Sequence, residues 1–188
     1  MLECLWRQPP SFLHPYQLRV GTPGGFEAAI HSARCYLEAL PADHVMVKLD
    51  FSNALNSLHR HIAYVSASRV PELHACCYSA YSHPSTLFYG SYVISSEKSL
   101  QQGDPLGPLL FCNTIQPLLS SLNSELNLRY LDDVTLAGPA DTVASGAANI
   151  TQPGGAMGLV LNTGKCELIV HRDCVVDDRP DVTVFHQS

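Results

Sequence analysis

The clearest pattern along this chain is the recurrence of hydrophobic residues at intervals of three and four. Between residues 26 and 40 this spacing predicts a helix with one apolar face, which ends at Pro41. The same spacing predicts a second helix over residues 55–65, and a third is predicted over residues 72–81. Each of these segments is expected to turn an apolar face toward the protein core.

A fourth helix is expected to begin directly after the loop "SLQQGD". Asp104 stands where a helix cap belongs, Pro105 suits the first helical position, and Pro117 should kink the helix. Residues 139–158 are patterned more weakly, because four glycines and Pro153 interrupt the segment. They predict a broken helix.

Short apolar runs predict the strands. The run "HVMVKLDF" (44–51) predicts a buried central strand with Asp50 at its exit. Residues 86–95 predict a hairpin, and two further strands are expected over 159–162 and 166–170, around the turn "TGK". Helices and hairpins in this mixed order predict an α+β protein, with an antiparallel sheet that carries its helices on one face.

Two adjacent acids interrupt another pair of short strands, in the stretch "RYLDDVTLAG" (129–138). Apolar residues alternate on both sides of Asp132 and Asp133, which predicts a hairpin with the acids at its tip. By itself, an Asp pair in a tight turn is the mark of an ordinary solvated turn. If the strand that ends at Asp50 is a neighbour in the same sheet, three carboxylates converge at one edge. Such a cluster repels itself unless it binds protons or cations, and its oxygen ligands suit Mg²⁺ or Mn²⁺.

Four segments in a fixed order carry a resemblance to a known family. They are "KLDFSNALNSL", "QQGDPLGPLLF", "YLDD" and "GLVLNTGKCEL". In this order they resemble the polymerase palm of reverse transcriptases, which are RNA-directed DNA polymerases. The residues within the four segments are most similar to those of the non-LTR retrotransposon type. The resemblance divides the chain into a partial fingers remnant and loop (1–25), a palm-like domain (26–170) and a loose acidic tail (171–188).

The resemblance implies a role for each residue at the matched positions. Asp50, Asp132 and Asp133 would hold Mg²⁺ or Mn²⁺ for two-metal nucleotidyl transfer onto a primer 3′-hydroxyl. Lys165 would protonate the departing pyrophosphate. The other matches would contact nucleotide or template, and they are the backbone at Phe51 and Ser52, the side chain of Leu55, the loop residues Gln102 and Gly103, and Tyr130 near the primer terminus.

The chain departs from the family pattern at three places. Leu55 stands where the family has an aromatic residue that blocks a ribose 2′-hydroxyl. Little sequence precedes "VGTPGG", where the family has its fingers, and little follows "CELIV", where it has its thumb. Two interpretations follow: a polymerase domain whose missing lobes lie on flanking sequence, or a catalytically dead remnant with a structural role or none. A phosphoacceptor signalling domain also gathers aspartates and a lysine, but its acids come in the opposite order.

Composition and net charge limit the kinds of binding partner that we expect for this chain. The hydrophobic share of 46% and charged share of 15% are typical of a globular protein. No run approaches the roughly 18 apolar residues of a membrane span, and the start lacks the pattern of a secretory signal, so we expect an intracellular protein of nucleus or cytoplasm without a membrane partner. The net charge of −6 is unusual for a nucleic-acid-binding protein, but a palm without its basic lobes can be acidic. The expected partners are a primed RNA or DNA template, held weakly, and deoxynucleoside triphosphates.

Overall fold

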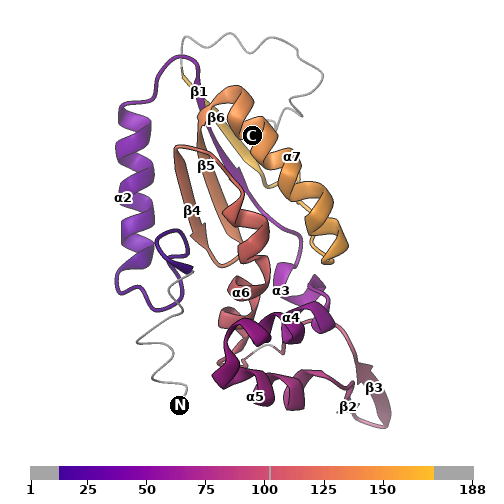
Figure 1. Cartoon of the computed structure of the whole chain (residues 1–188). Coiled ribbons are helices and arrows are strands. Elements are labelled where there is room, and N and C mark those ends of the chain that lie inside the picture. The colour runs from indigo at the N-terminus through magenta and orange to yellow at the C-terminus, as the bar shows by residue number, and fades with distance from the viewer. Residues whose placement is uncertain (1–12, 102, 172–188) are drawn as a thin grey trace.

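The computed structural model describes residues 13–101 and 103–171. Gln102, the first twelve residues and the acidic tail from Arg172 onward therefore lie outside the described residues. In chain order the elements are α2 (Gly25–Glu38), β1 (His44–Leu49), α3 (Ala54–Ser57), α4 (Arg60–Ser66), the 3₁₀ turn η2 (Ala67–Arg69), α5 (Pro71–Tyr81), β2 (Ser85–Tyr89), β3 (Tyr92–Ser96), α6 (Gly107–Ser120), β4 (Leu126–Tyr130), β5 (Asp133–Pro139), α7 (Ala140–Ala156) and β6 (Glu167–Val170) (Figure 1). No helix among the described residues is long and apolar enough to cross a membrane.

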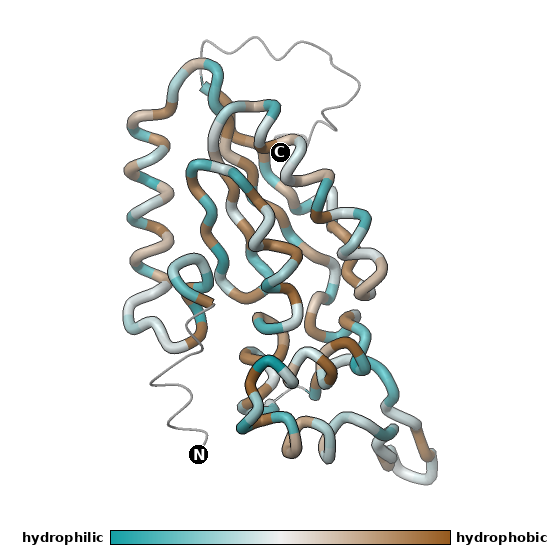
Figure 2. Tube along the Cα trace, in the orientation of Figure 1, coloured by the Kyte–Doolittle hydropathy of each residue, from teal (hydrophilic) through white to brown (hydrophobic). Residues whose placement is uncertain are grey.

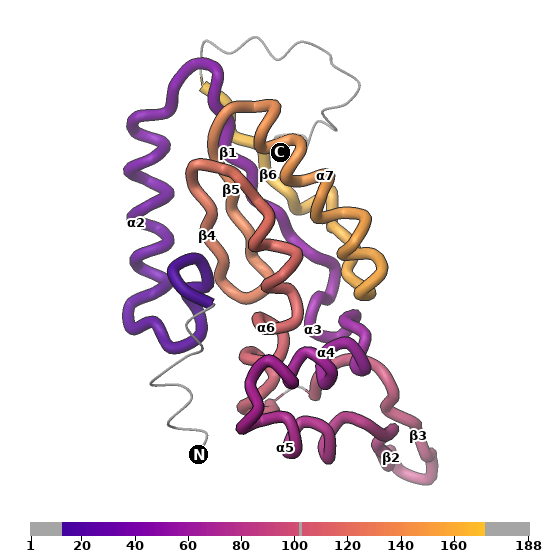
Figure 3. Tube along the Cα trace, in the orientation of Figure 1, coloured from indigo at the N-terminus to yellow at the C-terminus, as the bar shows by residue number. Residues whose placement is uncertain are grey.

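Four antiparallel strands form the main sheet, in the order β4-β5-β1-β6. In the register, Leu49 of β1 pairs with Val134 of β5, and Val47 of β1 pairs with Leu168 of β6. Figure 3 shows the violet β1 between the orange β5 and the yellow β6, although these strands lie far apart in sequence. Because β1 has a neighbour on each side, its apolar run is buried, as the sequence predicts.

The helices α6 and α7 cover one face of this sheet (Figure 1). The buried cluster between them joins Val47 and Leu49 of β1 with Leu136 of β5 and with Phe111 and Ile115 of α6. In Figure 2 hydrophobic positions recur along β1 and β5, the two strands at the centre of the sheet. The predicted fold class, an α+β protein with helices packed on an antiparallel sheet, is confirmed.

The predicted helix over 26–40 is present as α2, but its apolar face is incompletely covered. Phe26 is 55% exposed and Ile30 is 37% exposed, and Gly25 is the residue of this helix that is buried. A side chain at Gly25 would place its Cβ 1.9 Å from the Leu18 carbonyl oxygen. The close approach of these two backbones explains why the helix begins with glycine.

The predicted helix over 55–65 is wrong as a single element. The structure breaks it into α3 and α4, because Leu58 and His59 adopt extended conformations. Backbone partners from distant segments compensate for the break: His59 N–H donates to the Met157 carbonyl at 2.8 Å, and Ser99 N–H donates to the Leu58 carbonyl at 3.2 Å. These are tertiary contacts, which helical spacing alone does not reveal.

The prediction of a broken helix over 139–158 is also wrong. The structure has one continuous helix, α7, of 17 residues. Its buried residues are Val143, Gly146, Ile150 and Gly154, which recur at helical spacing along one face. Two of these four positions are glycine, so the face that packs on the sheet is not apparent from hydrophobicity.

Two smaller expectations also changed, and the expected position of Pro117 within its helix did not. Residues 159–162 form a single bridge, between Leu161 and Phe51, in place of a strand. The helix expected after Asp104 begins at Gly107, two residues beyond the expected first position. Pro117 lies inside α6, which continues to Ser120.

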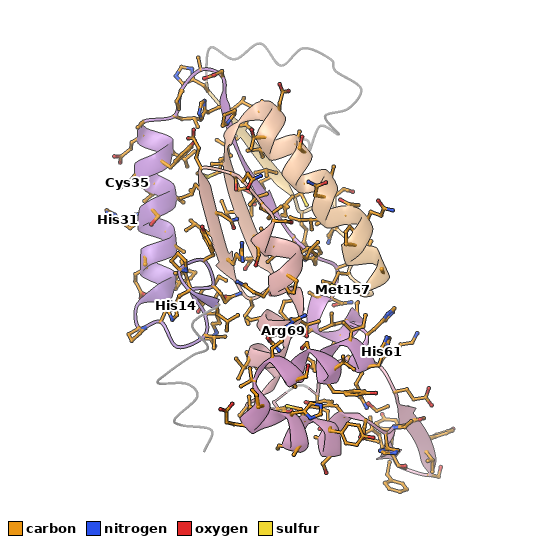
Figure 4. The ribbon with its side chains drawn as sticks, in the orientation of Figure 1. His14, His31, Cys35, His61, Arg69 and Met157 are labelled. Carbon is orange, nitrogen blue, oxygen red and sulfur yellow. The ribbon has the colours of Figure 1, made fainter. Side chains whose placement is uncertain are left out.

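Pro117 has a compensating contact from another helix segment. Proline has no N–H, so the Asn113 carbonyl four residues earlier lacks its usual helical partner. Arg69, labelled in Figure 4, supplies one. Its Nη1 donates to the Asn113 carbonyl at 2.6 Å. The contact ties η2 to α6.

Two further local predictions are confirmed, whereas only Asp132 of the two acids lies at the tip of its hairpin, because Asp133 begins β5. The helix over 72–81 is α5, and the hairpin over 86–95 is the separate two-stranded sheet β2–β3. This hairpin is exposed on both faces, with Phe88 78% exposed and Tyr89 74% exposed.

Candidate active site

The three acids of the predicted cluster lie at one end of the central strands. In the β1–β5 ladder Leu49 pairs with Val134, so the adjoining positions, Asp50 and Asp133, continue the two strands at the same end. Leu49 and Val134 are fully buried against the helices. Because side chains alternate along a strand, Asp50 and Asp133 lie on the opposite face, away from α6 and α7.

Asp132 lies in the two-residue turn that joins β4 to β5. Tyr130 pairs with Asp133, which leaves Leu131 and Asp132 at the tip. Burial raises the pKa of the Asp132 carboxyl, and the negative charges of Asp133 and Asp50 raise it further. The turn therefore holds a partly buried acid within electrostatic reach of two other carboxylates, where a cation would relieve the repulsion.

The donor chemistry of these acids fits Mg²⁺ or Mn²⁺. Among the residues that the structure describes, no three acidic, histidine or cysteine side chains are gathered tightly enough to form a complete metal site. Mg²⁺ at nucleotide-processing sites is held by one or two carboxylates together with substrate phosphates, so a complete protein cage is not required. Asp50 and Asp132 are the carboxylates that could serve in such a shared site.

The segment before β6 holds the backbone of Asp50. The Asp50 carbonyl accepts the Asn162 N–H at 2.8 Å, and the Asp50 N–H donates to the Cys166 sulfur at 3.4 Å. Lys165 lies between these two contacts in sequence and is exposed. This path of the chain brings Lys165 to the end of the sheet that carries the acids.

Phe51 and Ser52 follow Asp50 but differ in what they can offer a ligand. The Phe51 side chain is 5% exposed and belongs to the core. The Ser52 N–H donates to the Val160 carbonyl at 2.8 Å. This N–H is therefore engaged by the protein's own backbone.

A cavity of about 440 Å³ opens beside Asp132. Three predicted site residues line it: Leu55, Gly103 and Asp132. Gly103 has φ +86°, which favours glycine, and a Cβ there would meet nothing, so backbone conformation rather than space explains this residue. The other lining residues are Asn53, Ala54, Asn56, Gln101, Asp104, Gly107 and Pro108.

Asp104 lines this cavity, although the sequence suggested only a capping role for it. Its Oδ1 accepts the Leu106 N–H at 2.8 Å, and its Oδ2 accepts the Tyr81 hydroxyl. Burial raises the pKa of Tyr81, and the hydrogen bond to Asp104 adds to the rise, so the phenol keeps its proton. In the sequence, Tyr81 is the signal that could have indicated this role of Asp104, because a tyrosine on a buried helix face needs a partner for its hydroxyl.

Tyr130 is covered by residues from the N-terminal part of the chain. Phe26 makes an edge contact with its ring at 5.6 Å between centroids, and the Arg19 guanidinium lies 5.6 Å from the ring centroid. Since Tyr130 and Asp133 are paired, Arg19 is an exposed cation near the acidic end of the sheet. Sequence reasoning missed Arg19, because nothing in "QLRVG" links it to the distant hairpin.

The model of one protein family, reverse transcriptase (RNA-dependent DNA polymerase), matches residues 2–179. The chain belongs to the reverse transcriptase family. That match includes all four motif segments, the acidic turn and the cavity. A search of curated proteins gave no match to this reverse transcriptase chain.

Solved structures with a similar fold include telomerases. A Candida albicans telomerase in complex with a fragment of telomeric RNA is 11% identical, with a TM-score of 0.64 over 93% of this chain and 33% of the telomerase chain. An apo telomerase from Candida tropicalis is 13% identical, with a TM-score of 0.66 over 91% of this chain and 34% of the other. At these identities the likeness concerns the fold. The reverse transcriptase chain spans about one third of the length of each telomerase chain.

Proposed function

We propose that this reverse transcriptase chain is the palm of an RNA-directed DNA polymerase of the non-LTR retrotransposon type. The observation that supports it most is that Asp50, Asp132 and Asp133 lie at one end of the sheet, with Asp132 within electrostatic reach of the other two and beside the cavity lined by Leu55 and Gly103. These residues come from three motifs that are far apart in sequence. An ordinary solvated turn would not require the three acids to share one end of the sheet.

In the proposed reaction a primer 3′-hydroxyl gives up its proton to solvent water and attacks the α-phosphate of a deoxynucleoside triphosphate, and the bond from the α-phosphate to the bridging oxygen of the departing pyrophosphate breaks. Asp50 and Asp132 would hold two divalent ions, and the bound ions would supply positive charge that neutralises the phosphates. Asp133 would add negative potential that strengthens cation binding. Lys165 would donate a proton to the departing pyrophosphate oxygen.

The cavity beside Asp132 is the proposed nucleotide pocket. Leu55 would face the sugar of the incoming nucleotide, and the loop with Gln102 and Gly103 would lie beneath the base pair. Tyr130 would pack near the primer terminus. The partners are thus a primed RNA or DNA template and deoxynucleoside triphosphates, in the nucleus or cytoplasm, with fingers and thumb supplied by flanking sequence or another chain.

A catalytically dead remnant is the second candidate, and two features favour it. Leu55 replaces the family's aromatic residue, and the Ser52 N–H is engaged by the protein itself. A remnant would keep the fold but would have lost primer extension.

Primer extension with and without the missing lobes tests the proposal. The isolated chain is expected to extend a primer on an RNA template poorly or not at all, since the Lys and Arg of fingers and thumb supply most phosphate contacts. A chain completed with those lobes should extend the primer when Mg²⁺ or Mn²⁺ is present. No extension by the completed enzyme would favour the catalytically dead remnant. Efficient, processive extension by the isolated chain would contradict the expectation that fingers and thumb are needed.

Leu55→Phe should increase discrimination against ribonucleotides in the completed polymerase. Leu55 is partly buried against the core and lines the cavity, so a ring there would occupy volume that a 2′-hydroxyl needs. A steric difference of about 1.4 kcal/mol changes the ratio of rates tenfold, so we expect about a tenfold higher deoxy-to-ribonucleotide ratio of kcat/KM.

Leu55→Met is the matched control for this prediction. Methionine has a similar volume but no rigid ring, so the ratio should remain within about twofold of the wild type. If phenylalanine also leaves the ratio unchanged, Leu55 serves core packing and does not contact the sugar.

A further inference from the structure

An N-terminal segment, residues 16–18, pairs with the outer edge of β4. Arg129 N–H donates to the Tyr16 carbonyl at 3.0 Å, and Leu18 N–H donates to the Arg129 carbonyl at 2.8 Å. Gln17 and Arg129 form the parallel bridge between the two segments. The edge of the sheet is therefore covered just before the acidic turn begins.

Gln17 reaches from this segment into the turn itself. Its Oε1 accepts the Leu131 N–H at 3.1 Å and the Arg19 N–H at 3.2 Å. The residue is 1% exposed, so water does not compete for these bonds. Because both neighbouring groups are donors, the amide oxygen must face them, and the chemistry determines the orientation of the side chain.

Leu131 adopts a conformation that needs support. Its φ is +58°, in the left-handed region that is unfavourable for a residue with a Cβ atom. The hydrogen bond that the Leu131 N–H donates to Gln17 Oε1 fixes the orientation of the peptide N–H on which this φ depends. The next residue in the turn is Asp132, so the direction of its carboxylate depends on this conformation.

Gln17 also contains a buried donor that costs free energy. Its Nε2 has no hydrogen-bond partner among the described residues. A side chain that only filled this space would avoid the cost of an unpaired N–H by being apolar. The presence of a polar side chain at this buried position is therefore explained by its acceptor oxygen.

We infer that Gln17 is a positioning residue, which holds the Leu131 peptide so that the Asp132 carboxylate faces the metal site. The inference rests on the proposed function. Gln17 acts through Leu131 and touches neither metal nor substrate. Its removal lets the turn relax from the left-handed conformation and turns Asp132 away from Asp50.

Mn²⁺ binding by the purified 188-residue chain tests the inference, with free Mn²⁺ measured by its EPR signal. Gln17→Leu removes the acceptor and should weaken Mn²⁺ binding about tenfold, since residues that orient metal ligands change affinity by about 10–100-fold. Gln17→Glu keeps an acceptor of the same reach and should stay within about twofold of the wild type.

Gln116→Leu is the control for a general loosening of β4. The Gln116 Oε1 accepts a hydrogen bond from Arg129 Nη1 at 3.0 Å on the core side of this strand. We expect Gln116→Leu to lower the Tm as Gln17→Leu does, while Mn²⁺ affinity is retained. Equal weakening of Mn²⁺ binding by both leucine variants would overturn the inference.

Asp132→Asn separates this inference from the function on which it rests. If Asp132→Asn leaves Mn²⁺ binding unchanged, the proposed metal site is wrong. If Asp132→Asn weakens binding and Gln17→Leu does not, the positioning role alone is wrong.

Hydrogen exchange in the wild-type chain is a second test, and it requires no variant. The Leu131 N–H should exchange slowly, and exchange at the rate of an open turn would overturn the role of Gln17.

Discussion

Asp132→Asn is expected to abolish RNA-templated primer extension by the completed polymerase. The asparagine keeps the size of the side chain but removes the charge that would hold a divalent ion beside Asp50. Metal-assisted stabilisation of the transition state contributes several kcal/mol, so we expect kcat to fall about 10³-fold, which corresponds to about 4 kcal/mol. Single-turnover extension of a labelled primer measures this loss.

Two controls accompany the Asp132→Asn measurement. The variant should fold at least as well as the wild type without metal, because burial and the nearby Asp133 and Asp50 charges disfavour an ionised carboxyl at this position. Asp133→Asn should cost less activity, since Asp133 is exposed and starts β5 rather than forming the turn. Equal extension by wild type and Asp132→Asn would show that Asp132 does not hold the metal.

Arg129→Leu is expected to cause the largest loss of stability. Arg129 is 1% exposed, and its guanidinium donates to Asn127 Oδ1 and Gln116 Oε1, each at 3.0 Å, and to the Leu119 carbonyl. The guanidinium also lies 4.8 Å from the Tyr16 ring centroid. Burial lowers the pKa of Arg129 to about 10, so the group is still charged at neutral pH. Leucine would leave three buried acceptors without this donor, which should lower the free energy of unfolding by about 3–5 kcal/mol.

Urea denaturation of the purified chain measures the effect of Arg129→Leu. Arg34→Leu is the matched control, because Arg34 lies on the exposed side of α2, and surface substitutions change stability by about 0.5 kcal/mol or less. A loss below about 1 kcal/mol for Arg129→Leu would contradict the assigned role of its hydrogen bonds.

Sequence patterns predicted the elements whose burial follows from the order of apolar and polar residues within the element itself. The alternation around Asp132 and Asp133 and the apolar run that ends at Asp50 specify strands because strand burial follows a period of two. The sequence could not specify α7 in the same way. Its buried face contains Gly146 and Gly154, whose burial comes from packing against other elements and not from their own hydrophobicity.

The candidate site was predictable to the extent that its residues lie in the motifs. Asp132, Gly103 and Leu55 were identified from motif order, and they line one cavity. Gln17 and Arg19 were not identified, because their contacts to the hairpin join segments more than a hundred residues apart. Hydrogen bonds of that kind leave no periodic trace in a sequence.

Because β1 lies at the centre of the sheet, the sheet can be completed only after both of its neighbours have been synthesised. Its partner β5 is translated roughly 85 residues later, which at ribosomal speeds of about 5–20 residues per second is a delay on the order of 10 s. β6 follows β5, so the second neighbour arrives later still. During that interval the apolar run of β1 has neither neighbour, and an unpaired strand of this kind is prone to associate with other chains. A ribosome that stops before residue 133 would therefore release a polypeptide in which β1 has neither of its neighbours in the sheet.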